Sequence, residues 1–76
     1  MMDKVLESQL TELFETMASL KYSNNIAGTT EALLITMPKT NLPQAIEMYL
    51  EIIKTKPTEQ EFRTKISKIY KELRQA

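Results

Sequence analysis

Three pairs of acidic residues stand at the spacing that brings side chains together on one face of a helix. The pairs are Asp3 with Glu7, Glu12 with Glu15, and Glu47 with Glu51. Two carboxylates held close together can share a proton or bind a hard cation. All three pairs fall on or beside polar helix faces, away from the apolar surroundings that raise a carboxyl pKa, so we expect solvated surface acids rather than a site.

Ser67 and Lys71 form a further candidate pair, four residues apart. An exposed lysine stays protonated near neutral pH and cannot act as the base for a serine nucleophile. The chain has no His and no Cys, so the usual general base, the thiol nucleophile and the usual zinc ligands are all missing. Gly28 is the only glycine, and one glycine cannot build a phosphate-binding loop. The sequence therefore predicts a protein that is not an enzyme and has no catalytic residue, cofactor or metal.

The length of 76 residues, with 42% hydrophobic and 26% charged residues, is typical of one small globular domain over residues 1–76. Without disulfides or a metal, so small a domain depends on tight packing or self-association. Four acidic residues fall within the first 20 positions, where a signal peptide would be apolar. The longest apolar run, residues 32–35, is too short to span a bilayer. We expect a cytoplasmic protein without a membrane span.

Apolar residues recur every three or four positions, which predicts helices and no strands. The predicted helices are residues 3–21, 29–37 (short), 42–55 and 59–74, with a loop over residues 22–28. Asp3 and Asn41 are candidate caps, Thr58 and Glu61 form a capping box, and Phe14 widens the apolar stripe of the first helix. Short connections favour antiparallel neighbours, so the expected fold is a small all-α antiparallel bundle of four helices, or two stacked helical hairpins.

The predicted helices over residues 29–37 and 42–55 carry more apolar surface than four short helices can cover. Uncovered apolar patches mark interaction sites, and methionine side chains adapt to different partners. We expect the docking surface to include Leu33, Leu34, Met37, Met48, Leu50 and Ile52. The alternative, that these residues fill the core of the same chain, stays open.

Charge is unevenly distributed along the chain. The first 20 residues carry four acidic residues against one lysine, and residues 54–76 carry seven basic against three acidic residues. The basic residues opposite the apolar stripe of the last helix are Arg63, Lys65, Lys68, Lys71 and Arg74. One interpretation is that the acidic first helix and the basic last helix are neighbours; the other is nucleic-acid binding by a helix-turn-helix. The first is favoured because the net charge is zero and Glu59 and Glu61 begin the would-be recognition helix.

Residues 42–73 resemble the junction between two tetratricopeptide repeats. The second helix of one repeat is matched by Ala45, Tyr49, Ile52 and Pro57, and the first helix of the next by Ile66, Ser67 and Tyr70. The resemblance implies a peptide-binding or subunit-docking surface.

Together these observations predict a small, non-enzymatic helical module that docks onto another protein or onto itself as a homodimer, and that acts stoichiometrically in a regulatory role. Nucleic-acid binding through the basic face of the last helix is the alternative.

Overall fold

A computed structural model describes residues 4–74 of the chain, so the predicted roles of Asp3 and of the Arg74 side chain lie outside it. Its four helices are α1 (Lys4–Ser19), α2 (Asn24–Thr36), α3 (Leu42–Ile53) and α4 (Glu59–Arg74). The described residues contain no strand, and the prediction of a small all-α bundle is confirmed.

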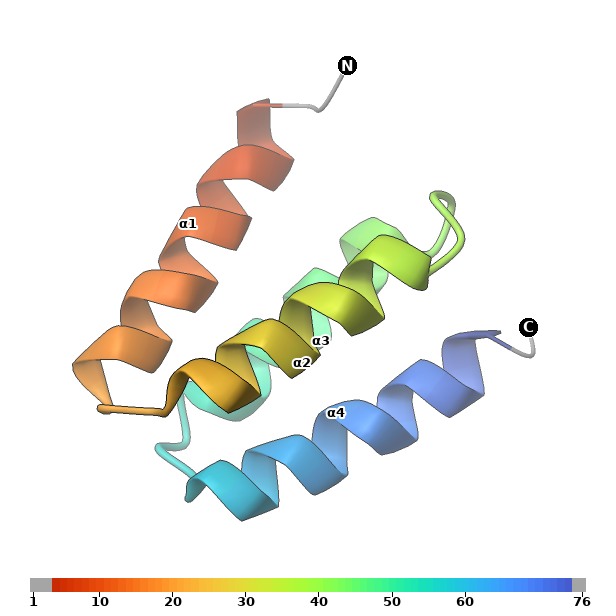
Figure 1. The fold of residues 1–76 in the computed structure, drawn as a ribbon. Helices are drawn as coiled ribbons and strands as arrows, with labels where there is room; N and C mark the ends of the chain where they lie inside the picture. The colour runs from red at the N-terminus through yellow and green to blue at the C-terminus, as the bar shows by residue number, and fades with distance from the viewer. Residues whose placement is uncertain (1–3, 75–76) are drawn as a thin grey trace.

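The helix α3 contacts each of the other three helices (Figure 1). It packs against α1 and against α4, while α2 lies along α4 and touches α3. Acidic α1 and basic α4 are therefore on different sides of the molecule, and the prediction that they are packed neighbours is wrong. The physical reason is that α3 is apolar over a wide arc and buries Ala45, Ile46 and Leu50. Because α3 can pack on more than one side, it lies between α1 and α4.

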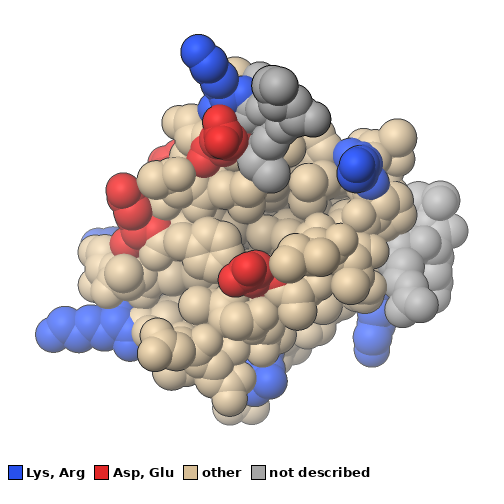
Figure 2. Space-filling model, turned by 45° about the horizontal axis from the view of Figure 1, so that its top comes forward, with Lys and Arg blue, Asp and Glu red and all other residues tan. Residues whose placement is uncertain are grey.

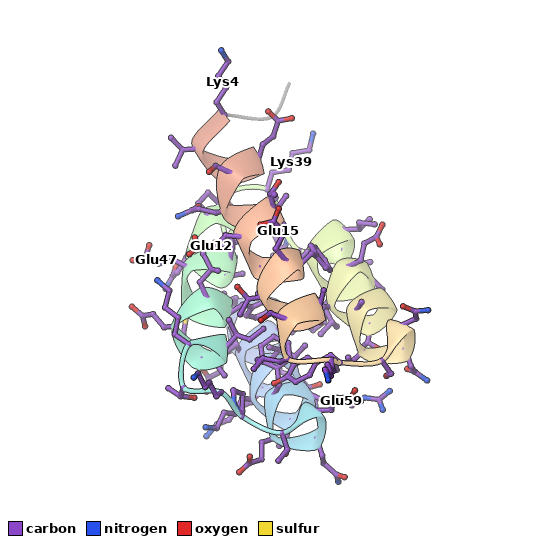
Figure 3. All side chains as sticks on the ribbon, turned by 90° about the vertical axis from the view of Figure 1, so that its left-hand side faces the viewer. Lys4, Glu12, Glu15, Lys39, Glu47 and Glu59 are labelled. Atoms are coloured by element: carbon purple, nitrogen blue, oxygen red, sulfur yellow. The ribbon has the colours of Figure 1, made fainter. Side chains whose placement is uncertain are left out.

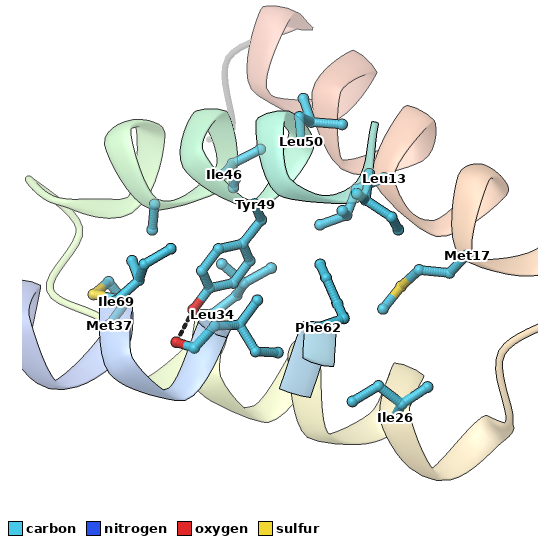
Figure 4. Packing of buried hydrophobic residues seen from close by; sticks show 13 residues of the cluster. Leu13, Met17, Ile26, Leu34, Met37, Ile46, Tyr49, Leu50, Phe62 and Ile69 are labelled. Carbon is cyan, nitrogen blue, oxygen red and sulfur yellow. Dashed lines mark hydrogen bonds between the residues drawn. The ribbon is translucent and has the colours of Figure 1, made fainter. Parts of the chain in front are cut away.

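The core is one cluster of side chains to which all four helices contribute (Figure 4). Phe62 is fully buried, with the ring of Tyr22 at 5.7 Å and the ring of Tyr49, edge on, at 6.4 Å. The Tyr49 hydroxyl donates a hydrogen bond to the carbonyl of Ile66 at 3.4 Å. Burial, assisted by the nearby Tyr70 hydroxyl, raises the pKa of Tyr49 to about 12. The tyrosines thus belong to the packing of the bundle.

The start of α2 differs from the prediction. Residues 22–28 were expected to be a loop, yet the helix begins at Asn24, directly after an extended Ser23 at the N-cap position. Ser and Asn are favoured at helix starts as well as in loops, because their side-chain oxygens can accept hydrogen bonds from backbone amides that have no helical partner. Gly28 consequently lies inside the helix. The other shifts are small: α1 ends at Ser19 instead of residue 21, α2 at Thr36 instead of residue 37, and α3 at Ile53 instead of residue 55.

α1 and α3 end in the same kind of turn. Lys21 has a φ of 62° and Lys56 a φ of 55°, both in the left-handed region. The Lys21 amide donates to the Ala18 carbonyl and the Tyr22 amide to the Met17 carbonyl, each at 3.0 Å, which is the Schellman pattern. The Lys56 amide repeats the first of these bonds, to Ile53 at 3.0 Å, and the second is missing because the next residue is a proline. The fold is therefore two helical hairpins built on one turn type.

The predicted capping box at the start of α4 is confirmed. The Thr58 amide donates to the Glu61 carboxylate at 3.0 Å, and the Glu61 amide donates to the Thr58 hydroxyl at 3.2 Å. The bond from the Thr58 backbone amide is the main reason that the pKa of Glu61 lies below its usual value.

Asn41 behaves differently from its predicted role as a cap. Its side chain makes no capping bond to α3; the side-chain amide donates instead to the carbonyl of Leu73 at 2.8 Å. Asn41 therefore joins the start of α3 to the end of α4.

Candidate functional site

An apolar groove lies between α1 and α2. The two helices leave the turn at Lys21 and diverge, α1 leaning on α3 and α2 on α4 (Figure 1). The space between them is a groove of about 350 Å³, whose apolar lining consists of Leu10, Phe14, Leu34, Ile35, Met37 and Leu42. Among residues 4–74, its only charged lining residues are Glu31 and Lys39. Figure 2 shows a hollowed, largely uncharged surface on this face of the molecule.

The α1 wall of the groove is formed by the part of the apolar stripe of α1 that α3 does not cover. Leu13 and Met17 are buried in the core, at 0% and 2% exposure. Leu10 and Phe14, one turn apart on the neighbouring edge of the same stripe, are only partly buried. An apolar stripe of this width needs a second helix to cover it completely. None of the four described helices covers this place, because α2 lies on α4.

Ile35 is the most exposed apolar side chain of the groove. Its exposed fraction is 72%, whereas Leu34, the preceding residue, is buried at 6%. Covering an isoleucine side chain completely is worth about 2 kcal/mol. Ile35 therefore gives this groove a driving force for association that a fully covered surface lacks.

The predicted docking residues divide into three groups in the structure. Leu34 and Met37 line the groove, although most of each side chain is buried. Leu50 is buried in the core, and Leu33, Met48 and Ile52 are partly buried against it, outside the groove. The six residues thus do not form one surface, since the apolar arc of α3 is largely used in packing against α1 and α4.

Four groove residues were not singled out from the sequence as docking residues. They are Leu10, Phe14, Ile35 and Leu42. Two features of the sequence point to apolar surface at these positions. They are the extra width that Phe14 gives to the apolar stripe of the first helix and the all-round apolar character of residues 32–37. Neither signal tells which neighbour covers the surface.

The acidic pairs form no common site in the part of the chain that is described. Glu7, Glu12, Glu15, Glu47 and Glu51 are all exposed, and Figure 3 shows Glu12 and Glu15 leaving α1 in different directions. Residues 4–74 contain no group of three or more acidic side chains placed to hold a metal ion. Lys71 is exposed, and within the same residues no hydrogen bond joins it to Ser67.

The basic face of α4 is exposed to solvent. Arg63, Lys65, Lys68 and Lys71 are all exposed, and Lys65 lies close enough to Glu61 to contribute to lowering the pKa of that carboxyl. The face is therefore basic on balance but includes acidic neighbours.

A second, polar cleft of about 380 Å³ lies where α2 and α4 begin. It is lined by Ser23, Asn25, Ile26, Glu59, Gln60, Arg63 and Thr64. The Glu59 carboxylate accepts one hydrogen bond from the Ser23 backbone amide and another from the Ser23 hydroxyl, while the Tyr22 hydroxyl donates to the Pro57 carbonyl. Burial, followed by the charges of Glu59 and Glu61, raises the pKa of Tyr22. These bonds join the two hairpin turns, so the cleft serves the fold and the apolar groove is the candidate functional site.

None of the helices in the described residues has the length and apolar character needed to cross a membrane. Comparison of the chain with protein-family models, with curated proteins and with solved structures finds no match in any of the three.

Proposed function

We propose that this protein is a non-enzymatic helical docking module, which binds an amphipathic helix in the groove between α1 and α2. The observation that carries the proposal is Ile35, which is 72% exposed on a groove with an apolar lining. A module of this kind acts stoichiometrically, as an adaptor, an inhibitor or a regulatory subunit.

Two diverging helices suit a third helix as the ligand. Amphipathic helices bind grooves through apolar residues at positions i, i+3 or i+4, and i+7. The groove offers apolar side chains from both walls, and Met37, which also lines it, has a flexible side chain that adapts to different shapes. Glu31 and Lys39 are the only charged residues that line it in the described part of the chain, so apolar burial supplies the affinity and these two charges set the orientation of the ligand.

A peptide library displayed on phage, selected on the immobilised protein, tests the proposal. The variant Ile35→Asp places a charge in the groove, and we expect it to weaken binding of the selected peptides by at least about tenfold. Enriched peptides should carry apolar residues at the helical spacing given above. Val5→Asp is the matched control, because Val5 is also an exposed apolar residue, at 63%, and does not line the groove.

The proposal fails if no peptide is enriched, or if the enriched peptides bind Ile35→Asp as tightly as the unchanged protein. Far-ultraviolet circular dichroism of both variants checks that the helices are retained.

Nucleic-acid binding through Arg63, Lys65, Lys68 and Lys71 is the second candidate function. It is favoured by the position of α4, which is not packed against the acidic helix α1. Fluorescence anisotropy with labelled duplex and single-stranded oligonucleotides should then show binding that falls steeply as salt is added. Absence of binding at low salt removes this candidate.

A further inference from the structure

We propose that the helix occupying the groove is α2 of a second copy of this chain, in a dimer with two-fold symmetry. The inference rests on the proposed function, because it takes the groove as a docking site and names the ligand. Three features of α2 and of the groove support it.

The first feature is that one small surface contains both a protruding apolar side chain and a hollow to receive it. Ile35 projects into solvent, and Leu10 and Phe14 lie on the opposite wall of a groove of about 350 Å³. A surface that pairs with itself about a two-fold axis must be complementary to itself. An axis through the mouth of the groove places Ile35 of each copy against Leu10 and Phe14 of the other, so both copies cover their apolar surface at once.

The second feature is the arrangement of charge around Ile35. Glu31 lies four residues before Ile35 and Lys39 four residues after it, and both line the groove. Lys39 lies beyond the end of α2 at Thr36, so one charge comes from the helix and the other from the turn that follows it. A two-fold axis that passes between Glu31 and Lys39 sets Glu31 of each copy opposite Lys39 of the other, twice in the dimer. Both side chains are exposed and have no ion-pair partner among residues 4–74. The two copies thus complement each other in charge as well as in shape.

The third feature is the outward face of α2. Glu31 is the only charged residue in this helix, and the exposed positions next to it include Gly28 and Ala32. The space where a Gly28 side chain would lie is open, with no atom within 4 Å. Small side chains shorten the distance between packed surfaces, so this face of α2 lets a second copy approach closely. A helix meant to remain in water normally carries more charge.

Reversing each charge separately, and then mixing the two variants, tests the pairing. The unchanged chain should be dimeric by sedimentation equilibrium. At low ionic strength, Glu31→Lys and Lys39→Glu should each weaken self-association by about tenfold, because each places two like-charged pairs in the dimer. An equimolar mixture should form heterodimers of nearly normal affinity, since position 31 of either variant then faces an opposite charge at position 39 of the other. Native mass spectrometry with one variant isotopically labelled measures the heterodimer directly.

Three results overturn the inference. They are a monomer at the highest soluble concentration, a dimer that neither charge reversal weakens, and a mixture that forms no heterodimer. The peptide selection separates these failures from failure of the proposed function. If the unchanged chain is monomeric while the selected peptides bind and lose affinity with Ile35→Asp, the groove is a docking site for another protein and only self-pairing is wrong.

Discussion

The carboxylate of Glu59, at the start of α4, accepts hydrogen bonds from both the backbone amide and the hydroxyl of Ser23, at the N-cap of α2. The two residues are 36 positions apart in the chain. A negative charge near the first turn of a helix is favourable, because the backbone amides there point toward it without helical partners. Ser23 makes no side-chain capping bond to its own helix, and the second hairpin supplies the acceptor instead. One hairpin thereby helps to cap the other.

We predict that Glu59→Gln lowers the free energy of unfolding by about 1 kcal/mol, since it replaces a charged acceptor by a neutral one at a partly exposed position. Urea denaturation followed by circular dichroism measures the change. Glu72→Gln, at an exposed position of the same helix, is the control and should have little effect. Equal changes in the two variants would show that the bond between the hairpins contributes nothing specific.

The left-handed residues Lys21 and Lys56 give a second prediction. Glycine adopts this conformation without the steric cost that a β-carbon imposes, so Lys21→Gly and Lys56→Gly should each raise the free energy of unfolding by about 0.5–1 kcal/mol. The double variant should show coupling between the two sites, because a hydrogen bond joins Tyr22 and Pro57, the residues that follow them. Lys65→Gly, inside α4, should instead lower stability by about 1 kcal/mol. A loss of stability at position 21 or 56 contradicts the assigned turn conformation.

Gly28 provides a third prediction. It lies within α2, with a negative φ and open space around the position of a β-carbon. Gly28→Ala should therefore raise the free energy of unfolding by about 0.5–1 kcal/mol, through the higher helix propensity of alanine. The opposite substitution at the next turn, Ala32→Gly, should lower it by a similar amount. Thermal unfolding at a protein concentration that gives only monomer compares the two, and a stabilising Ala32→Gly would argue against helix at these positions.

The buried hydroxyl of Tyr49 makes a prediction about alkaline pH. The folded protein raises the pKa of Tyr49 from its ordinary value of 10.0 to about 12, so the folded state holds this proton more tightly than the unfolded state. The resulting stability is complete below pH 10 and is lost as the pH rises from about 10 to about 12. Tyr49→Phe should show a shallower loss of stability across this range, measured by urea denaturation at successive pH values. An unchanged pH dependence would mean that another group controls alkaline unfolding.

The features that could be predicted from the sequence are those decided by neighbouring residues. The capping box of Thr58 and Glu61 and the bounds of α4 depend on residues three or four positions apart, and the structure has both as predicted. The start of α2 could not be fixed in the same way, because a run of Ser and Asn suits a loop and a first helical turn equally well. The contact that favours the helix comes from Glu59, in the other hairpin.

The candidate site was harder to predict, for a related reason. An apolar stripe shows which residues avoid water but not which helix covers them. Leu50 and Phe14 both extend apolar stripes, yet Leu50 is buried in the core and Phe14 lines an open groove. The difference follows from the position of α3 between α1 and α4, which results from packing across the whole chain. The resemblance of residues 42–73 to tetratricopeptide repeats stays a prediction.

The position of α3 between the acidic and the basic helix also has an electrical consequence. Although the formal net charge of the chain is zero, α1 has three acidic residues against one lysine, and α4 carries five basic against three acidic residues. Because these helices lie on different sides of the molecule, the protein has a permanent dipole moment. It should turn its α4 side toward a negatively charged surface and its α1 side toward a positive one, and so interact with ion-exchange resins of either sign despite its electrical neutrality.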